Sequence, residues 1–408
     1  MSRIGILLEL LCRPRLAGGC GLVASYERAF VQTVLGEGSI PCLAFWKGRV
    51  ALWTILRALG AERGGEVVVP AYTCEMVPVA VKFAGFKCVY ADVAPGAYNA
   101  GAAEIAGLTG AETKVVLSQH TYGLFADVVA ALASAKSCGA AVVEDCCQLV
   151  TFQAGCGAAG RLGAAAFFST QWNKPFSTGL GGLAAFNDRR LYQAARDIRD
   201  GFDRPGDLGR ARSLAVQGFA YERTVRPSTQ ARVAGAYRFA QRRGWVQGTN
   251  AAGDYGQFMP TDYACGATNL QAILGLRQLG RWRRNVAHRR LLTEFYLQQL
   301  PALGADVRAL GPAPGQALWA VPLLVENKQE ILSLAARCAL PVATWFDVPP
   351  VHLAPATAER YDYRPGQCPR AERLIGLEIH LPTSPAVTLS QAEAALRFLH
   401  RHARFTSL

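Results

Sequence analysis

The sequence predicts an α/β protein: a large domain built on a mostly parallel sheet between helices, then a smaller C-terminal α/β domain. Short apolar runs of strand length alternate with stretches of helical periodicity from about residue 44 onward. Strands that alternate with helices usually pair in parallel and are covered on both faces. At 408 residues, 51% of them hydrophobic and 18% charged, the chain can bury a large core.

The first half of the chain predicts a series of buried strands joined by helices. Strands are expected over 66–70, 87–92, 114–118, 140–145, 164–168 and 183–186, and helices over 50–59, 77–83 and 127–137. Gly139 stands where a C-cap glycine would end the last of these helices. In such sheets ligands bind beyond the carboxyl ends of the strands, so residues that follow a strand are the candidates for chemistry.

The second half divides into an irregular stretch and a compact tail. Residues from about 200 to 261 are rich in Arg, Gly and Gln and are expected to form an insertion, part loop and part helix. The tail predicts these elements: a long helix or kinked pair over 269–300, with Gly275 and Gly280 as weak points, strands over 317–325 and 342–346, and helices over 328–338 and 390–400. The expected divisions are an N-terminal arm without clear periodicity (1–40), a large domain (41–265), and a connecting helix with the small domain (266–408).

The net charge of +13 is carried mostly by arginine and attracts phosphate groups. Nucleotide-linked substrates, nucleic acid and an anionic membrane surface all carry such groups, and solvated helix faces are the structural alternative. Aromatic residues do not interleave with the arginines as they do in a single-strand binding platform, so nucleic acid is not expected as a partner. Peripheral membrane contact has no other support in the sequence.

Cysteine usage and hydropathy indicate a cytoplasmic protein. The chain has twelve cysteines but no Cys-x-x-Cys pair, so buried free thiols are expected rather than a zinc site or a disulfide scaffold, and no metal is predicted. No apolar run approaches the roughly 20 residues that span a bilayer. Residues 4–11 are short and include Glu9, and an extra glycine before Cys20 spoils a lipoprotein cleavage signal.

Two residues stand out at strand ends. Lys174 follows the strand expected over 164–168 and precedes a glycine-rich turn, and it is one of only seven lysines in the chain. Asp145 closes the strand expected over 140–145. An amine that can bond to an aldehyde, with a carboxylate for a pyridine nitrogen, suits pyridoxal 5'-phosphate.

Seven ordered segments extend this observation. They lie at 47–52, 65–73, 85–92, 119–123, 144–148, 169–182 and 268–272. Together they resemble the pyridoxal-phosphate sugar aminotransferases of the DegT/StrS family, which have the aspartate aminotransferase-like fold (fold type I). Each segment alone is weak, whereas seven in the correct order are a strong signal.

The resemblance implies a role for each matching residue. Lys174 corresponds to the lysine that holds the cofactor covalently and shuttles the proton, and Asp145 to the partner of the ring nitrogen. Gln148 matches the position that contacts the cofactor ring or its O3′ oxygen, and Ser169 the phosphate-binding hydroxyl. The backbone amides of Gly48 and Arg49 would bind the phosphate at a helix N-terminus, and Thr73 and His120 are candidates for lining the site. The implied partners are an amino donor such as glutamate, a nucleotide-linked keto-sugar acceptor and a second copy of the chain.

Three features depart from the family pattern. Cys74 stands where many relatives have an aromatic residue that stacks on the cofactor. Ala264 stands where relatives often have an asparagine that reaches the neighbouring subunit's cofactor phosphate, and the insertion is long. Other pyridoxal-phosphate reactions, such as desulfuration or dehydration, and a non-catalytic fold relative are the alternatives. Dehydratase relatives replace the lysine with histidine, so Lys174 argues against that reaction.

Overall fold

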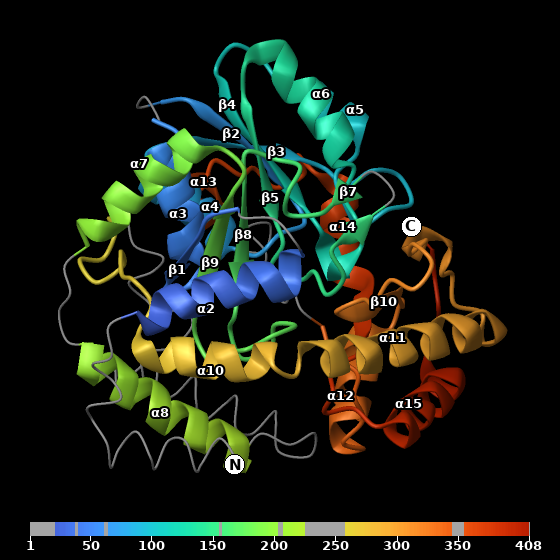
Figure 1. Cartoon of the computed structure of the whole chain (residues 1–408). Helices are drawn as coiled ribbons and strands as arrows, with labels where there is room; N and C mark the ends of the chain where they lie inside the picture. Colours follow the sequence, from blue (N-terminus) through green and yellow to red (C-terminus); the bar gives the residue numbers. More distant parts are fainter. Residues whose placement is uncertain are drawn as a thin grey trace.

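The computed structural model of the chain describes residues 21–36, 40–60, 64–154, 157–202, 207–224, 258–344 and 355–407. Its centre is a seven-stranded sheet. In spatial order the strands are β1 (Cys42–Phe45), β9 (Gly182–Phe186), β8 (Ala165–Ser169), β5 (Ala141–Asp145), β4 (Thr113–Gln119), β2 (Glu66–Pro70) and β3 (Lys87–Ala91). β9 is antiparallel to both neighbours, and all pairs from β8 to β3 are parallel. The predicted α/β fold with a mostly parallel sheet is confirmed (Figure 1).

The middle residues of the strands are mostly apolar and buried, which fits a sheet covered on both faces. Successive side chains point to opposite faces, so Val67 and Val115 belong to one core and Val68 and Val116 to another. The helices that contact these strands include α3 (Gly48–Ala58), α4 (Met76–Ala84), α6 (Val128–Cys138) and α7 (Arg189–Asp200), and α5 (Ala102–Ala106) packs on α6 and adds Ile105 to the core of Val68 and Val116. Gly139 ends α6 in the left-handed conformation, with φ 72°, as predicted.

Part of the expected N-terminal arm is helical, although the sequence there showed no clear periodicity. There the chain forms α2 (Leu22–Phe30), which continues as a π-helical turn (Val31–Leu35). Its buried side chains include Tyr26, Phe30 and Val34, a spacing of four residues that places them on one face of the helix. The helix therefore covers the part of the sheet made by β1, β9 and β8 (Figure 1).

A second, two-stranded antiparallel sheet forms the centre of the C-terminal part. It consists of β10 (Ala320–Leu324) and β11 (Glu378–Pro382). The surrounding helices are α11 (Trp282–Gln299), α12 (Lys328–Arg337), α14 (Pro369–Leu377) and α15 (Leu389–His402). The short helix α13 (Pro355–Arg360) is followed by Tyr361, which packs against Met76 and Val79 of α4. Of the strand predicted over 342–346, Ala343 makes an isolated bridge to His380, and residues 345 and 346 lie outside the described residues.

The predicted insertion contains one described helix, α8 (Asp207–Thr224), and residues 225–257 lie outside the described residues. Leu214 of α8 is buried in a small core with Trp46 and Leu180, so this helix packs beside the start of α3. Within the described parts of the chain, no helix is both long and apolar enough to cross a membrane.

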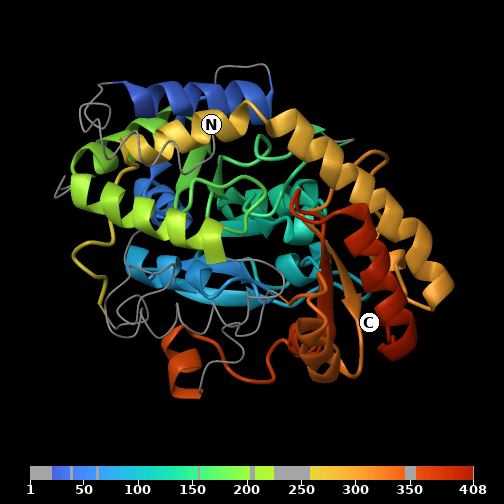
Figure 2. The ribbon, with the colours of Figure 1, turned by 90° about the horizontal axis from the view of Figure 1, so that it is seen from below.

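The long helix predicted over 269–300 is a pair, α10 (Asn269–Leu279) and α11, which meet at Gly280. Gly275 does not break α10. Instead it allows close packing on α2, because a Cβ at this position would lie 2.3 Å from the Cε2 of Tyr26. Figures 1 and 2 show α2 and α10 running side by side.

Gly275→Ala is therefore expected to destabilise the protein by about 1–3 kcal/mol, the usual cost of overpacking a well-filled core. Urea unfolding followed by circular dichroism measures the change. Gly376→Ala in α14 is the matched control, since a Cβ there meets nothing within 4 Å and the exchange favours helix by roughly 0.5–1 kcal/mol. Equal midpoints for the two variants would contradict this account of the α2–α10 contact.

Candidate active site

Two neighbouring parallel strands bring the predicted lysine and aspartate to one edge of the sheet. β5 ends at Asp145 and β8 ends at Ser169, and Lys174 lies in the turn that follows. The backbone N–H of Lys174 donates to Gln171 O at 3.0 Å, and the side chains of Lys174 and Asp145 are both buried. Burial raises the pKa of the Asp145 carboxyl group, and the nearby positive charge of Lys174 opposes part of this rise. The structure thus places the two candidate catalytic groups within electrostatic reach of each other.

The environment of Asp145 disfavours the ionised form of its carboxyl group. Burial raises the pKa of Asp145 above its ordinary value, although hydrogen bonds from the amide and thiol of Cys147 and interactions with Lys174 and His120 oppose the rise. The amide of Cys147 donates to Oδ1 at 2.9 Å. A cation placed against this carboxylate would favour its ionised form, as a protonated pyridine nitrogen does.

The candidate phosphate donors converge at the start of α3. Lys47 is the N-cap residue, and the first bond of the helix runs from the amide of Val50 to Lys47 O, so the amides of Gly48 and Arg49 precede it. A Cβ on Gly48 would lie 3.0 Å from Cβ and 3.3 Å from Oγ of Ser169. Glycine here therefore lets the helix start lie directly against the serine hydroxyl.

The same close approach continues into the next strand. A Cβ on Gly182, the first residue of β9, would lie 2.4 Å from Cα of Gly48. Amides at a helix start beside a hydroxyl are a chemical match for a phosphate group. With the amine of Lys174 and the carboxylate of Asp145 on the same edge, these groups together fit pyridoxal phosphate: amides and a hydroxyl for its phosphate, an amine for its aldehyde and a carboxylate for its ring nitrogen.

Gln148 is held in a fixed orientation. Its Oε1 accepts from the amide of Tyr122 at 2.5 Å, so its Nε2 is the remaining donor group. Tyr122 has φ 58° and is completely buried. Its hydroxyl forms a hydrogen bond with the hydroxyl of Tyr72 at 2.7 Å, which ties together the chain segments after β2 and β4.

Thr73 and His120 support the wall of the site from behind. Thr73 is completely buried, and its hydroxyl donates to Oε1 of Gln119. His120 accepts from the amide of Ala126 at Nδ1 and forms a bond with Glu144 at Nε2, 3.3 Å long. Both of its ring nitrogens are engaged, so neither side chain presents a free polar group to a ligand.

Glu144 is the centre of this support and not a metal ligand. His120, Glu144 and Cys146 have candidate ligand atoms within 4.8 Å of one another. However, the Glu144 carboxylate also accepts backbone amides, from Gly160 at 2.7 Å and from Gly163 at 2.8 Å. Burial alone would raise the pKa of Glu144, but these bonds and His120 bring it below its ordinary value. The carboxylate of Glu144 is therefore engaged in internal hydrogen bonds that hold the segment after β5.

The thiols of Cys74 and Cys147 lie close to the same charges. Burial raises the pKa of both thiols, and the charge of Lys174 acts on each of them. Both are half-buried in the structure. Cys74 therefore offers a small neutral surface near the lysine, and Ala264 packs against the main core with an apolar side chain that cannot bind phosphate.

Trp319 is the site residue that the sequence did not reveal. It immediately precedes β10, and its Nε1 donates to Asn173 O at 2.8 Å. Nζ of Lys174 lies 5.8 Å from the centre of the Trp319 ring, which is also stacked on Tyr122 at an interplanar angle of 17°. The small sheet thus supplies one wall around the lysine.

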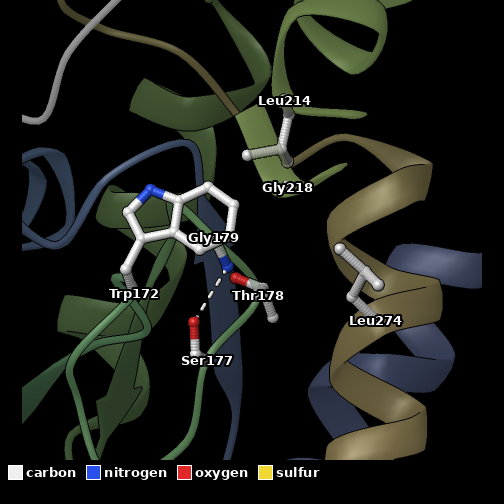
Figure 3. A pocket seen from close by; sticks show the side chains of 7 residues that line it. All are labelled: Trp172, Ser177, Thr178, Gly179, Leu214, Gly218 and Leu274. Carbon is white, nitrogen blue, oxygen red and sulfur yellow. Dashed lines mark hydrogen bonds between the residues drawn. The ribbon is translucent and has the colours of Figure 1, made fainter. Parts of the chain in front are cut away.

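A small pocket lies behind the lysine turn, between Trp172, Leu214 and Leu274 (Figure 3). Its volume of about 20 Å³ is room for roughly one water-sized molecule. The pocket lies where the turn, α8 and α10 meet, and it is too small for a substrate.

Comparison with known proteins identifies the family of the chain. A profile of the DegT/DnrJ/EryC1/StrS aminotransferase family matches residues 21–399. GDP-perosamine synthase of Caulobacter vibrioides is 27% identical over 285 residues, which cover 70% of this chain and 63% of that protein, so the chain spans less than two thirds of this relative.

Solved structures show the same fold. A DegT DnrJ EryC1 StrS aminotransferase from Brucella abortus superimposes with a TM-score of 0.73 at 19% identity, covering 98% of this chain and 95% of the other. Bacillus subtilis NtdA, solved with bound cofactor PMP, gives 0.69 at 19% identity, covering 98% and 82%. The chain belongs to the DegT/DnrJ/EryC1/StrS aminotransferase family.

Proposed function

We propose that this protein transfers an amino group from an amino acid, with glutamate as the first candidate, to the carbonyl of a nucleotide-linked keto-sugar. Pyridoxal phosphate is the cofactor of this family of aminotransferases. The observation that carries the proposal is the joint placement of Lys174, Asp145 and the Gly48–Ser169 contact at one edge of the sheet. The Caulobacter relative, whose name identifies a GDP-linked amino sugar, supports the acceptor class.

The bound cofactor would supply a ring that accepts the electron pair left behind when the donor's α-proton departs. Asp145 would face the ring nitrogen and keep it protonated, which makes the ring a better electron acceptor. Gln148 would donate from Nε2 to the ring oxygen. The amides of Gly48 and Arg49 and the hydroxyl of Ser169 would hold the phosphate and set the distance from it to Lys174.

Lys174 would act as both base and acid. Its Nζ would take up the α-proton of the amino donor and release it again within the site. The Trp319 ring lies beside Nζ and favours a cation there by a cation–π interaction. Because this ring is buried, it also excludes water from one side of the amine.

The site chemistry disfavours a desulfurase. That reaction needs a cysteine thiolate as nucleophile, but burial raises the pKa of Cys74 and Cys147, the two described thiols near Lys174. Both would be neutral thiols near neutral pH.

Half-reaction spectroscopy tests the proposal. The purified protein is loaded with pyridoxal phosphate and mixed with glutamate, and loss of the visible absorbance band reports amino transfer to the cofactor. The amino form is then offered a panel of GDP-, UDP- and dTDP-linked keto-sugars, with mass spectrometry of the products. Release of sulfide or alanine from cysteine, without amino-sugar formation from any acceptor, would refute the proposal.

The insertion helix α8 carries an arginine close to the start of α3, where we propose that phosphate binds. The guanidinium carbon of Arg210 lies 6.0 Å from the ring centre of Trp46, which directly precedes Lys47. We propose that Arg210 contributes to binding the diphosphate of the acceptor. Arg210→Gln is expected to raise KM for the nucleotide sugar about tenfold, the effect of one charge-assisted hydrogen bond, with little change for glutamate.

Arg212→Gln on the same helix is the matched control, because Arg212 is exposed. Steady-state kinetics with each substrate varied separately measures both constants. The same acceptor KM for the two variants would show that overall charge, rather than the place of Arg210, is responsible.

We further propose that the protein works as a homodimer, as its family membership suggests. Sedimentation equilibrium of the cofactor-loaded protein tests this, and a monomer at the concentrations used for activity would refute it.

A further inference from the structure

We call the amides of Gly48 and Arg49 and the hydroxyl of Ser169 the phosphate cradle. The buried side chain of Gln271 joins the start of α3 to the glycine-rich turn that packs against it. Gln271 lies in the first turn of α10 and is 1% exposed. Its Oε1 accepts from the amide of Thr268 at 2.8 Å, which closes a capping box at the start of the helix. Its Nε2 donates to Trp46 O at 3.1 Å and to Leu180 O at 2.7 Å.

The two carbonyl groups lie on either side of the cradle. Trp46 directly precedes Lys47, the N-cap of α3, and its amide is bonded to Cys265 O at 3.0 Å. Leu180 lies in the glycine-rich turn and is followed by Gly181 and Gly182. Because Gly182 packs directly on Gly48, the bonds from Nε2 hold both partners of this contact.

The strand that carries Ser169 belongs to the same assembly. Thr170 follows Ser169, and its hydroxyl is 2.6 Å from the hydroxyl of Thr178. Thr178 in turn donates to Leu180 O at 2.6 Å, the same carbonyl that accepts from Gln271. A Cβ on Gly181 would lie 2.2 Å from Oγ1 of Thr170, so the turn fits here only with glycine.

We propose that Gln271 is a positioning residue for the cofactor phosphate. It fixes the start of α3 against the glycine-rich turn, so that the amides of Gly48 and Arg49 and the hydroxyl of Ser169 point at one anion. This inference rests on the cofactor assigned under the proposed function. It predicts that loss of the Nε2 donor weakens binding of the phosphorylated cofactor in particular.

The chain contains its own control for the capping box. Thr388 and Gln391 form the same box at the start of α15, where Oε1 of Gln391 accepts from the amide of Thr388 at 2.9 Å. In the described structure the side chain of Gln391 bonds only within that box. Gln391→Ala therefore removes a capping box without affecting the cradle.

The experiment compares Gln271→Ala, Gln271→Met and Gln391→Ala as apoproteins. Equilibrium titration with pyridoxal phosphate, with pyridoxal and with inorganic phosphate gives three dissociation constants for each protein, and circular dichroism checks that each is folded. We expect the Gln271 variants to bind pyridoxal phosphate about tenfold or more weakly, corresponding to roughly 1.4 kcal/mol. Their affinity for inorganic phosphate should fall by a similar factor, whereas their dissociation constant for pyridoxal should change about twofold or less. All three dissociation constants of Gln391→Ala should likewise change about twofold or less.

Met fills the volume of Gln without its donors, so it separates loss of the bonds from creation of a cavity if the Ala variant is unfolded. Equal weakening of pyridoxal phosphate and pyridoxal in the Gln271 variants would overturn the inference, and so would unchanged binding of both. A wild-type protein that binds no pyridoxal phosphate would overturn the proposed function together with this inference. Unchanged binding by the variants beside normal binding by the wild type overturns the inference alone.

Discussion

Lys174→Ala is expected to abolish amino transfer, lowering kcat by at least about 10³-fold. A positioned base contributes about 10²–10⁴-fold by proton transfer alone, and this variant also loses the covalent attachment of the cofactor. The visible absorbance band of the loaded protein should disappear. Stopped-flow spectroscopy with glutamate and steady-state amino-sugar formation measure the two effects.

Lys136→Ala is the control for Lys174→Ala, because Lys136 is an exposed lysine on α6. Lys136→Ala should keep both the visible absorbance band and the rate of amino transfer. A small primary amine added to Lys174→Ala should restore part of the proton transfer, since the cavity left beside Trp319 can admit it. Full activity of Lys174→Ala would refute the assignment of the base.

Asp145→Asn is expected to lower kcat by about 10²–10³-fold, the range found when one electrostatic partner of a developing charge is removed. The amide keeps the shape of the side chain but cannot hold the ring nitrogen in its protonated form. The affinity of this variant for the cofactor should fall by a smaller factor than its kcat. Asp188→Asn is the control, because Asp188 also follows a strand but caps α7 through the amides of Arg190 and Leu191.

The carboxylate of Asp145 should also make the stabilisation of the protein by its cofactor depend on pH. Burial raises the pKa of Asp145 above its ordinary value. A raised pKa in the folded state favours folding at acid pH, and this contribution is lost as the pH rises through the raised pKa. A protonated cofactor nitrogen compensates the ionised carboxylate, so stabilisation by the cofactor should grow with pH over that interval. The growth should be absent in Asp145→Asn, and thermal melts with and without cofactor measure it.

Local sequence patterns predicted the elements that position the site. The strands that end at Asp145 and Ser169 begin as short, mostly apolar runs, the pattern expected in a sheet covered on both faces. The helix after Lys47 follows from a continuous apolar stretch, and Gly139 marks a helix end. Such features depend on neighbours in the chain, so the positions of Asp145, Ser169 and Lys174 at one sheet edge could be inferred before any tertiary contact was known.

Long-range packing explains what could not be predicted. Trp319 reaches Lys174 only because the small sheet docks on the large one, and its place in an apolar run gives no sign of this. Gln271 belongs to a recognisable segment, but its amide bonds a carbonyl 225 residues away. The orientation of Gln148 depends on the left-handed backbone of Tyr122, a conformation that a tyrosine does not signal.

The reversed direction of β9 has a consequence for the order in which the site assembles. Because β9 runs back beside β8, with Ser169 opposite Gly182, the segment that carries Lys174 leaves and returns at the same edge of the sheet. Closing so short a loop costs little chain entropy. The lysine turn can therefore form as a local unit early in folding, whereas the wall supplied by Trp319 requires closure of a loop of more than a hundred residues. We expect hydrogen exchange during refolding to show protection of β8 and β9 before protection of β10.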